Sequence, residues 1–282
     1  MDKTLKKRNQ EIYSVSYAKI NLVLNVESLL NSGFNKIRTL FSEIDLHDKL
    51  KYTLTKCKEI EVWSNIEELC GESNLIYTVA DYLKNEYSVN SGVRIELQKE
   101  IPLSAGLGGG SSNAANALKA LNELWVLDLS IDEMHNIAAK FGSDLNFFLA
   151  GGTACGSNRG EIIEKIDPIK IEQILLVKPP LGISSKEAYN LVAKRERNEN
   201  FEEFIKTKNI ELIFNDLQIG IINKYPEIGV IIDELKRSGA DVAQMSGSGS
   251  TCFGIYSSTE LLKQSYDYFT TLGYWTRITK TI

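Results

Sequence analysis

The residues with the clearest chemical potential form a glycine- and serine-rich segment near the middle of the chain. In order they are Pro102, Leu103, Ser104, Ala105, Gly106, Leu107, Gly108, Gly109, Gly110, Ser111 and Ser112. Glycine has no Cβ, so successive backbone amides can close around phosphate oxygens, and a helix that begins there adds the positive end of its dipole. A tight turn without a ligand is the alternative, but four glycines within five residues and two serines exceed what a turn requires. The segment therefore predicts a site for the phosphates of a nucleotide.

This segment differs from the two commonest phosphate-binding motifs. No Gly-Lys-Ser/Thr sequence ends it, so it is not a Walker A loop, and Ser111 stands where the dinucleotide fingerprint has its last glycine. Ser111 and Ser112 instead offer hydroxyl groups to a phosphate or to Mg²⁺.

The neighbouring elements are expected to position this loop between a strand and a helix. Apolar residues alternate over 93–97, as in a half-buried strand that is expected to end at Pro102, and recur at helical spacing over 114–125. Strands are also expected at 13–26, within 49–63 and at 173–177, helices at 74–87, 131–141, 187–193 and 228–236, and a glycine-serine turn at 245–250 before an apolar run at 252–256.

Length and composition limit the classes of function. A chain of 282 residues favours two lobes, and the formal net charge of −5 argues against a nucleic-acid partner. The sequence contains no apolar run long enough to cross a membrane, so we expect no membrane partner and a cytoplasmic location. The four cysteines are scattered without metal-binding spacing and are expected to be buried thiols.

Three motifs together resemble those of the GHMP kinases, the family of galactose, homoserine, mevalonate and phosphomevalonate kinases. The motifs are 102–115, Tyr17-Ala18-Lys19-Ile20-Asn21-Leu22 and Met245-Ser246-Gly247-Ser248-Gly249-Ser250. The resemblance implies an α+β, two-lobed fold with a ribosomal-protein-like N-terminal domain and a ferredoxin-like C-terminal domain. We place these domains at residues 1–157, which would bind ATP, and 158–282.

Further segments resemble the members of that family that phosphorylate a hydroxyl of a cytidine diphosphate-linked alcohol in non-mevalonate isoprenoid biosynthesis. These segments are Arg38-Thr39-Leu40-Phe41, Gly142-Ser143-Asp144, Gly151-Gly152-Thr153-Ala154 and Asn215-Asp216-Leu217. The resemblance implies Asp144 as the base and Lys19 as the group that orients the hydroxyl and offsets charge. Taken alone, such an aspartate is more often a helix cap, and such a lysine more often lies on a solvated strand face.

The resemblance also implies the ligands. The substrate is expected to contact Asn21, Phe34, Asn35 and Tyr189, with ATP and Mg²⁺ as cofactors, and no residue is assigned as a metal ligand. Glu161 is a weaker candidate for a carboxylate that serves the metal or the loop structure, and Lys99 precedes the phosphate loop and could approach ATP, but both are more often surface residues. A small molecule is the expected partner, and the chain is expected to be a monomer or a weak homodimer.

Two departures from the family pattern keep other functions open. Phe34-Asn35 stands where these kinases usually carry Tyr-His, although Phe34 can still stack on a base and Asn35 can still donate and accept hydrogen bonds. Asn146 replaces the proline of the usual Asp-Val-Pro, which relaxes the backbone after Asp144. The alternatives are another GHMP kinase acting on a small alcohol or phosphoalcohol, and a nucleotide-binding protein of this family without catalysis.

Overall fold

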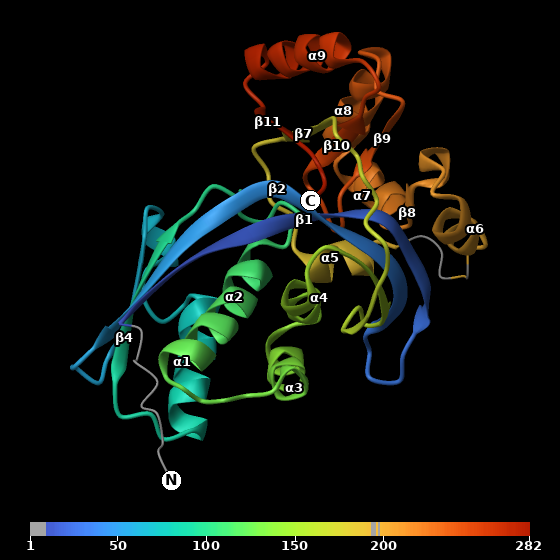
Figure 1. The fold of residues 1–282 in the computed structure, drawn as a ribbon. Helices are drawn as coiled ribbons and strands as arrows, with labels where there is room; N and C mark the ends of the chain where they lie inside the picture. The colour runs from blue at the N-terminus through green and yellow to red at the C-terminus, as the bar shows by residue number, and fades with distance from the viewer. Residues whose placement is uncertain (1–9, 193–195, 197) are drawn as a thin grey trace. The chain divides into compact units, whose positions relative to one another are not determined.

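The computed structural model describes residues 10–192, 196 and 198–282, in which helices and strands are intermixed along the chain (Figure 1). The strands are β1 (Glu11–Leu29), β2 (Asn35–Thr55), β3 (Ile60–Ser64), β4 (Gly92–Gln98), β5 (Thr153–Asn158), β6 (Ile162–Lys165), β7 (Ile174–Lys178), β8 (Phe214–Asn215), β9 (Val242–Met245), β10 (Cys252–Ile255) and β11 (Trp275–Thr279). The α-helices are α1 (Leu75–Glu86), α2 (Gly109–Leu124), α3 (Ile131–Phe141), α4 (Leu145–Ala150), α5 (Ser185–Asn190), α6 (Asn200–Thr207), α7 (Gln218–Lys224), α8 (Pro226–Arg237) and α9 (Thr259–Thr271).

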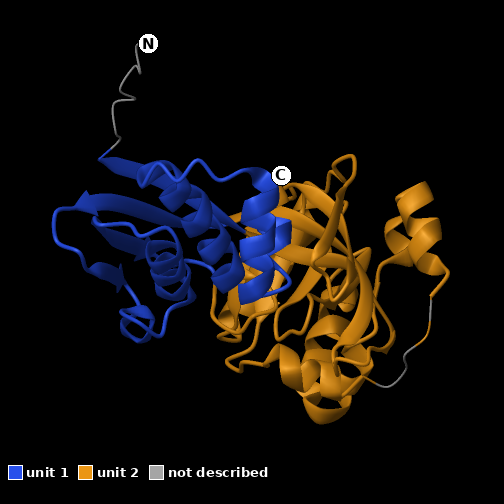
Figure 2. Cartoon of the chain, turned by 90° about the horizontal axis from the view of Figure 1, so that it is seen from below, with its two compact units in different colours: residues 1–17, 47–101, 109–149 blue, residues 18–46, 102–108, 150–282 orange. Residues whose placement is uncertain are grey.

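The chain divides into two compact units that do not follow a single cut in the sequence (Figure 2). Unit 1 contains the described residues up to 17, then 47–101 and 109–149, and unit 2 contains 18–46, 102–108 and the described residues from 150 to 282. The predicted domains, 1–157 and 158–282, are each one continuous stretch, and this assignment stays a prediction.

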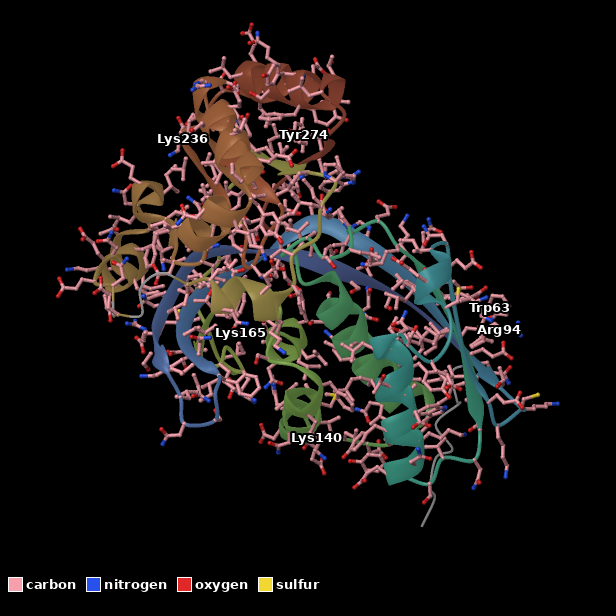
Figure 3. All side chains as sticks on the ribbon, turned by 180° about the vertical axis from the view of Figure 1, so that it is seen from behind. Trp63, Arg94, Lys140, Lys165, Lys236 and Tyr274 are labelled. Atoms are coloured by element: carbon pink, nitrogen blue, oxygen red, sulfur yellow. The ribbon has the colours of Figure 1, made fainter. Side chains whose placement is uncertain are left out.

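Unit 1 contains the strand predicted at 93–97 and the helices predicted at 74–87 and 114–125. Residues of β4 alternate between buried and exposed positions, and β4 lies between β2 and β3 in the sheet. Asn74 caps α1 by accepting a hydrogen bond from the amide of Ile76 (2.9 Å), and α1 packs on α2. Trp63 and Arg94 lie at the exposed surface of this sheet (Figure 3).

Unit 2 contains a second sheet with the strand order β11-β7-β10-β9, in which all neighbours are antiparallel. Along the chain these strands and the helices that pack on them follow a β-α-β-β-α-β order, with α8 after β7 and α9 between β10 and β11. This is the arrangement of a ferredoxin-like domain. The α+β fold class, with its ferredoxin-like part, is confirmed.

Several local details differ from the sequence prediction. The strand predicted to end at Pro102 ends at Gln98, and α4 and the β5–β6 hairpin were not predicted. Of the cysteines, only Cys252 is buried, whereas Cys57 is exposed and the other two are half-buried, so the expectation of four buried thiols is wrong. None of the helices in the described part of the chain has both the length and the hydrophobicity needed to span a bilayer.

Candidate functional site

The glycine-serine loop has the backbone that its composition predicts. Gly106 and Gly108 adopt φ values of +72° and +70°, in the left-handed region that favours glycine. The α2 helix begins at Gly109, so the last residues of the loop form its first turn. A Cβ at Gly110 would meet nothing within 4 Å, which leaves open space beside the first turn. These features suit phosphate binding at a helix N-terminus.

Lys19 lies on β1 and is tied to the loop through its backbone. Its amide donates a hydrogen bond to the carbonyl oxygen of Leu107 (3.0 Å), and both residues belong to unit 2. The side chain is buried, and Nζ donates to Oδ1 of Asn21 (2.5 Å) and lies 5.5 Å from the ring centroid of Phe41. The lysine of the N-terminal motif is therefore a buried, oriented cation and not a side chain on a solvated strand face.

The glycine-serine turn at 245–250 packs directly against these residues. A Cβ at Gly247, whose φ is +55°, would lie 2.8 Å from Oδ1 of Asn21 and 2.9 Å from Nζ of Lys19. Ser246 donates from Oγ to the carbonyl oxygen of Gly106 (3.2 Å). The parts of the three predicted motifs that belong to unit 2, residues 18–22, 102–108 and 245–250, thus meet there.

Two side chains that carry amide groups hold this turn in place. Nδ2 of Asn215 donates to the carbonyl oxygens of Met245 and Gly247, both at 2.8 Å. Nε2 of Gln244 donates to the carbonyl oxygens of Asn21 and Leu22, both at 3.1 Å. The sequence marked Asn215 only as part of a motif and gave no signal for Gln244, whose contact with β1 joins residues more than 200 positions apart.

Asp144 immediately precedes α4 and belongs to unit 1. It is half-buried, and its carbonyl oxygen accepts a helix hydrogen bond from the amide of Phe148 (3.4 Å). Lys19 belongs to unit 2, so the pairing of these two residues in catalysis stays a prediction.

The short α4 helix is held by side chains of its neighbours in unit 1. Oδ1 of the buried Asn146 lies 3.1 Å from Nδ1 of His135 on α3, and Nζ of Lys119 on α2 donates to the carbonyl oxygen of Phe148 (3.0 Å). Asn146, which the sequence marked only as a missing proline, therefore makes a contact that proline cannot make.

Comparison with known proteins identifies the family. The models of the GHMP kinases N terminal domain and the GHMP kinases C terminal domain match residues 74–152 and 185–273. A 4-diphosphocytidyl-2-C-methyl-D-erythritol kinase of Thermodesulfovibrio yellowstonii is 37% identical over 280 residues, which cover 95% of this chain and 96% of that protein. The chain belongs to the GHMP kinase family. A protein of the same name from Thermoanaerobacter pseudethanolicus is 39% identical over 262 residues, or 89% of this chain and 90% of its own.

The same comparison extends to solved structures. A crystal structure of 4-(cytidine 5'-diphospho)-2C-methyl-D-erythritol kinase superposes with a TM-score of 0.79 and 25% sequence identity, covering 96% of this GHMP kinase and 99% of that chain. The predicted family and fold are confirmed, and so is the prediction of an ATP-dependent small-molecule kinase.

The residues predicted to bind the substrate of this GHMP kinase lie in unit 2, but they differ in exposure. Phe34 is 55% exposed, and the guanidinium of Arg159 lies 5.1 Å from the centroid of its ring. Asn35 is half-buried as the first residue of β2, and Tyr189 on α5 packs partly against the apolar core of unit 2. Their contact with a substrate stays a prediction.

Arg159 is a residue of this GHMP kinase that the sequence did not single out. Glu161 holds it, since Oε2 accepts a hydrogen bond from the Arg159 amide (2.8 Å) and Oε1 accepts from its Nε (3.3 Å). Glu161 also accepts a bond from Nδ2 of Asn158 (2.7 Å). Partial burial opposes ionisation, but these hydrogen bonds leave the pKa of Glu161 below its ordinary value. Glu161 is thus half-buried and not a fully exposed surface residue, and its hydrogen bonds agree with the alternative that it serves the loop structure.

Proposed function

We propose that this chain transfers the γ-phosphoryl group of ATP to the 2-hydroxyl of 4-diphosphocytidyl-2-C-methyl-D-erythritol, in non-mevalonate isoprenoid biosynthesis. The main support is 37% identity over 95% of the chain to a relative that carries the name of that kinase. The meeting of Lys19, residues 102–108 of the phosphate loop and the 245–250 turn within unit 2 adds a physical argument, because phosphoryl transfer depends on positioning and on positive charge.

The proposed chemistry assigns one task to each polar group. The bond between the γ-phosphorus and the bridging oxygen of ADP breaks as the alcohol oxygen bonds to phosphorus, and the hydroxyl proton passes to the carboxylate of Asp144. Lys19, which Asn21 holds through Oδ1, orients the hydroxyl and offsets the negative charge on the transferring group. The backbone amides of the glycine loop hold the phosphates of ATP.

Mg²⁺ is proposed as the second cofactor. Within residues 10–192, 196 and 198–282 no group of three or more His, Cys, Asp or Glu side chains could hold a metal ion. Mg²⁺ commonly keeps several waters and is bound through substrate phosphates with one or two protein ligands, so a loop that holds phosphates fits it, and Ser111 and Ser112 could add hydroxyl ligands. When bound, the ion would neutralise phosphate charge.

The test is a coupled assay of ADP release with Mg-ATP and 4-diphosphocytidyl-2-C-methyl-D-erythritol. We expect turnover that depends on this alcohol and that falls about 10² fold or more in Asp144→Asn, while the affinity for ATP is kept. Asp132→Asn, which changes an exposed aspartate in the first turn of α3, is the matched control and should keep full turnover.

Parallel assays with homoserine, mevalonate and phosphosugars separate the proposal from its alternatives. Turnover of one of these alcohols but not of the cytidine diphosphate-linked one would assign the chain to another GHMP kinase activity. ATP binding without turnover of any alcohol, unchanged in Asp144→Asn, would indicate a nucleotide-binding protein without catalysis. Cytoplasmic location and a monomeric or weakly dimeric state are part of the proposal.

A further inference from the structure

A buried carboxylate at the base of the phosphate loop gathers donors from several segments of unit 1. Asp48 lies on β2 with 0% of its surface exposed. Its Oδ1 accepts hydrogen bonds from the amides of Glu100 (2.7 Å) and Ile101 (2.8 Å), which follow β4. Its Oδ2 accepts from Nζ of Lys99 and from Nδ2 of Asn113 (2.8 Å). One side chain therefore holds the segment that enters the loop and the first turn of the helix that leaves it.

The same network reaches the last residue of the loop. Nδ2 of Asn113 donates to Oγ of Ser16 (3.0 Å) as well as to Asp48, so the two hydrogens of this amide have separate acceptors. Oγ of Ser16 in turn donates to Oγ of Ser112 (2.7 Å). The hydroxyl of Ser112 is thus fixed through a chain of buried hydrogen bonds that ends at Asp48.

Lys99 is a buried lysine that lies just before the phosphate loop. It is only 6% exposed, which makes the expectation of a surface lysine wrong. Burial lowers its pKa, and the ion pair with Asp48 acts against that shift. A Cβ at Gly109 would lie 2.7 Å from its Nζ, so the ammonium group lies against the first residue of α2. A cation beside the N-terminus of a helix is repelled by the positive end of the helix dipole, and here the carboxylate of Asp48 supplies the compensating negative charge.

Stability alone does not account for such a pair. Burying two charges costs desolvation energy, and replacing a buried ion pair with apolar residues is often neutral or stabilising. What the pair and its hydrogen bonds do is fix the geometry on both sides of the loop, at 99–101 and at 112–113. Phosphate binding by backbone amides depends on such preorganisation.

We propose that Asp48 is a positioning residue for ATP, acting through Lys99, Asn113 and Ser16 to hold the phosphate loop in its binding geometry. This rests on the proposed role of residues 102–112 in binding the ATP phosphates. Asp48 itself touches neither ATP nor the alcohol in this scheme. Its loss should weaken ATP binding and leave recognition of the alcohol unchanged.

The test measures two variants of the full chain. In Asp48→Asn the amide oxygen can still accept from Glu100 and Ile101, but an NH₂ group replaces the acceptor of Lys99 and Asn113. Ser16→Ala removes the hydroxyl that joins Asn113 to Ser112 and leaves the ion pair intact. The control is Glu61→Gln, which breaks the exposed ion pair with Arg94 on the same sheet (2.8 Å; Arg94 is labelled in Figure 3).

Four quantities are measured for each protein: the dissociation constant of ATP by titration calorimetry without alcohol, the KM of ATP, the KM of the alcohol, and the Tm. We expect the dissociation constant and the KM of ATP to rise roughly tenfold in Asp48→Asn and about threefold in Ser16→Ala, the range of lost hydrogen bonds. The KM of the alcohol should change less than about twofold, and Glu61→Gln should match the parent.

A merely structural role predicts a different outcome, because a KM does not depend on how much of the protein is folded. A lower Tm and a lower apparent kcat with an unchanged KM for ATP in both variants would overturn the proposal. If Asp48→Asn does not fold, Ser16→Ala decides alone. A parent that binds ATP but does not phosphorylate the alcohol would refute the proposed substrate and leave the ATP measurements decisive, whereas a parent that binds no ATP would overturn both.

Discussion

The backbone amide of Lys19 donates a hydrogen bond of 3.0 Å to the carbonyl oxygen of Leu107. This bond joins the strand that carries the proposed catalytic lysine to the loop that is proposed to hold the ATP phosphates. The side chain of Lys19 is also fixed by Asn21. A displacement of the loop at Leu107 is therefore expected to displace Lys19, and a displacement of Lys19 to displace the loop. The position of residues 102–108 of the loop and the position of the Lys19 ammonium group therefore depend on the same local packing in unit 2.

Gly247→Ala should impair turnover more than stability. The added methyl group would lie 2.8 Å from Oδ1 of Asn21 and 2.9 Å from Nζ of Lys19, closer than ordinary contacts allow. The side chains of Asn21 and Lys19 or the turn itself must then shift, and small displacements of catalytic groups can cost about a hundredfold in rate. We expect kcat to fall about tenfold to a hundredfold, as measured by ADP release.

Gly273→Ala is the control for backbone strain. Gly273 also has a positive φ, +84°, but a Cβ there would meet nothing within 4 Å. Gly273→Ala should lower the free energy of unfolding on the order of 1 kcal/mol, by about as much as Gly247→Ala does, and should keep the kcat of the parent. Equal kcat values in Gly247→Ala and the parent would show that the turn does not constrain Lys19.

The phosphate loop and the helices around it could be predicted from sequence because their determinants are local. A strand that ends before clustered glycines, with a helix after them, is encoded within residues 93–125. Helical spacing over 131–141 likewise predicted α3 at the observed bounds. These patterns need no knowledge of tertiary structure.

The supports of the site could not be predicted in the same way because they join distant residues. Asp48 reaches Asn113, and Gln244 reaches β1, across separations of 65 and more than 200 positions. Lys99 reads as a surface lysine from its neighbours, since burial of a charge depends on a partner that only folding supplies. The α4 helix is too short, at six residues, to show a periodic pattern.

Phe34→Leu should weaken binding of the cytidine-bearing alcohol and leave ATP unaffected. Phe34 is 55% exposed, and the guanidinium of Arg159 lies 5.1 Å from the centroid of its ring. Stacking of a base on an aromatic side chain is worth about 1–3 kcal/mol, so the KM of the alcohol should rise between roughly fivefold and a hundredfold. Steady-state kinetics with each substrate varied in turn measures this.

Tyr268→Leu removes another exposed aromatic ring, on α9, and should leave both KM values unchanged. A KM for the alcohol that does not change in Phe34→Leu would remove Phe34 from the substrate site. It would also weaken the case for a cytidine-bearing substrate.

Asp216 should give the stability of the chain a specific pH dependence. Burial raises its pKa above the ordinary value, while hydrogen bonds from Nδ2 of Asn25 and the amide of Val26, each 2.7 Å, act against this shift. The folded state therefore binds this proton more tightly than the unfolded state does. The contribution of Asp216 to the free energy of unfolding falls as the pH rises from its unfolded pKa to its raised folded pKa.

Urea unfolding of the parent and of Asp216→Asn between about pH 4 and pH 7 isolates this contribution. The stability of the parent relative to the variant should decrease with rising pH and then become constant. Asp233→Asn, which changes an exposed aspartate on α8, supplies the baseline. A difference that stays flat or rises with pH would contradict the expected shift.

Asn146 and His135 should position Asp144, in the role that the family pattern of the sequence analysis gives to a proline. Oδ1 of Asn146 lies 3.1 Å from Nδ1 of His135, within hydrogen-bond distance. The bond ties the first turn of α4, which directly follows Asp144, to α3. Asn146→Ala and His135→Ala should each lower kcat about tenfold and leave the dissociation constant of ATP unchanged.

Asn146→Pro distinguishes positioning from simple loss of stability. Proline has a fixed φ suited to the first turn of a helix, where its missing amide hydrogen costs little. It should therefore restore the constraint on the backbone after Asp144 without the bond to His135, and keep kcat within about threefold of the parent. The kcat of Asn146→Pro is compared with that of Asn146→Ala at equal concentrations of folded protein, set by circular dichroism. If the two variants lose the same activity, the contact with His135 does something other than hold the backbone, and if neither loses activity, Asp144 does not depend on it.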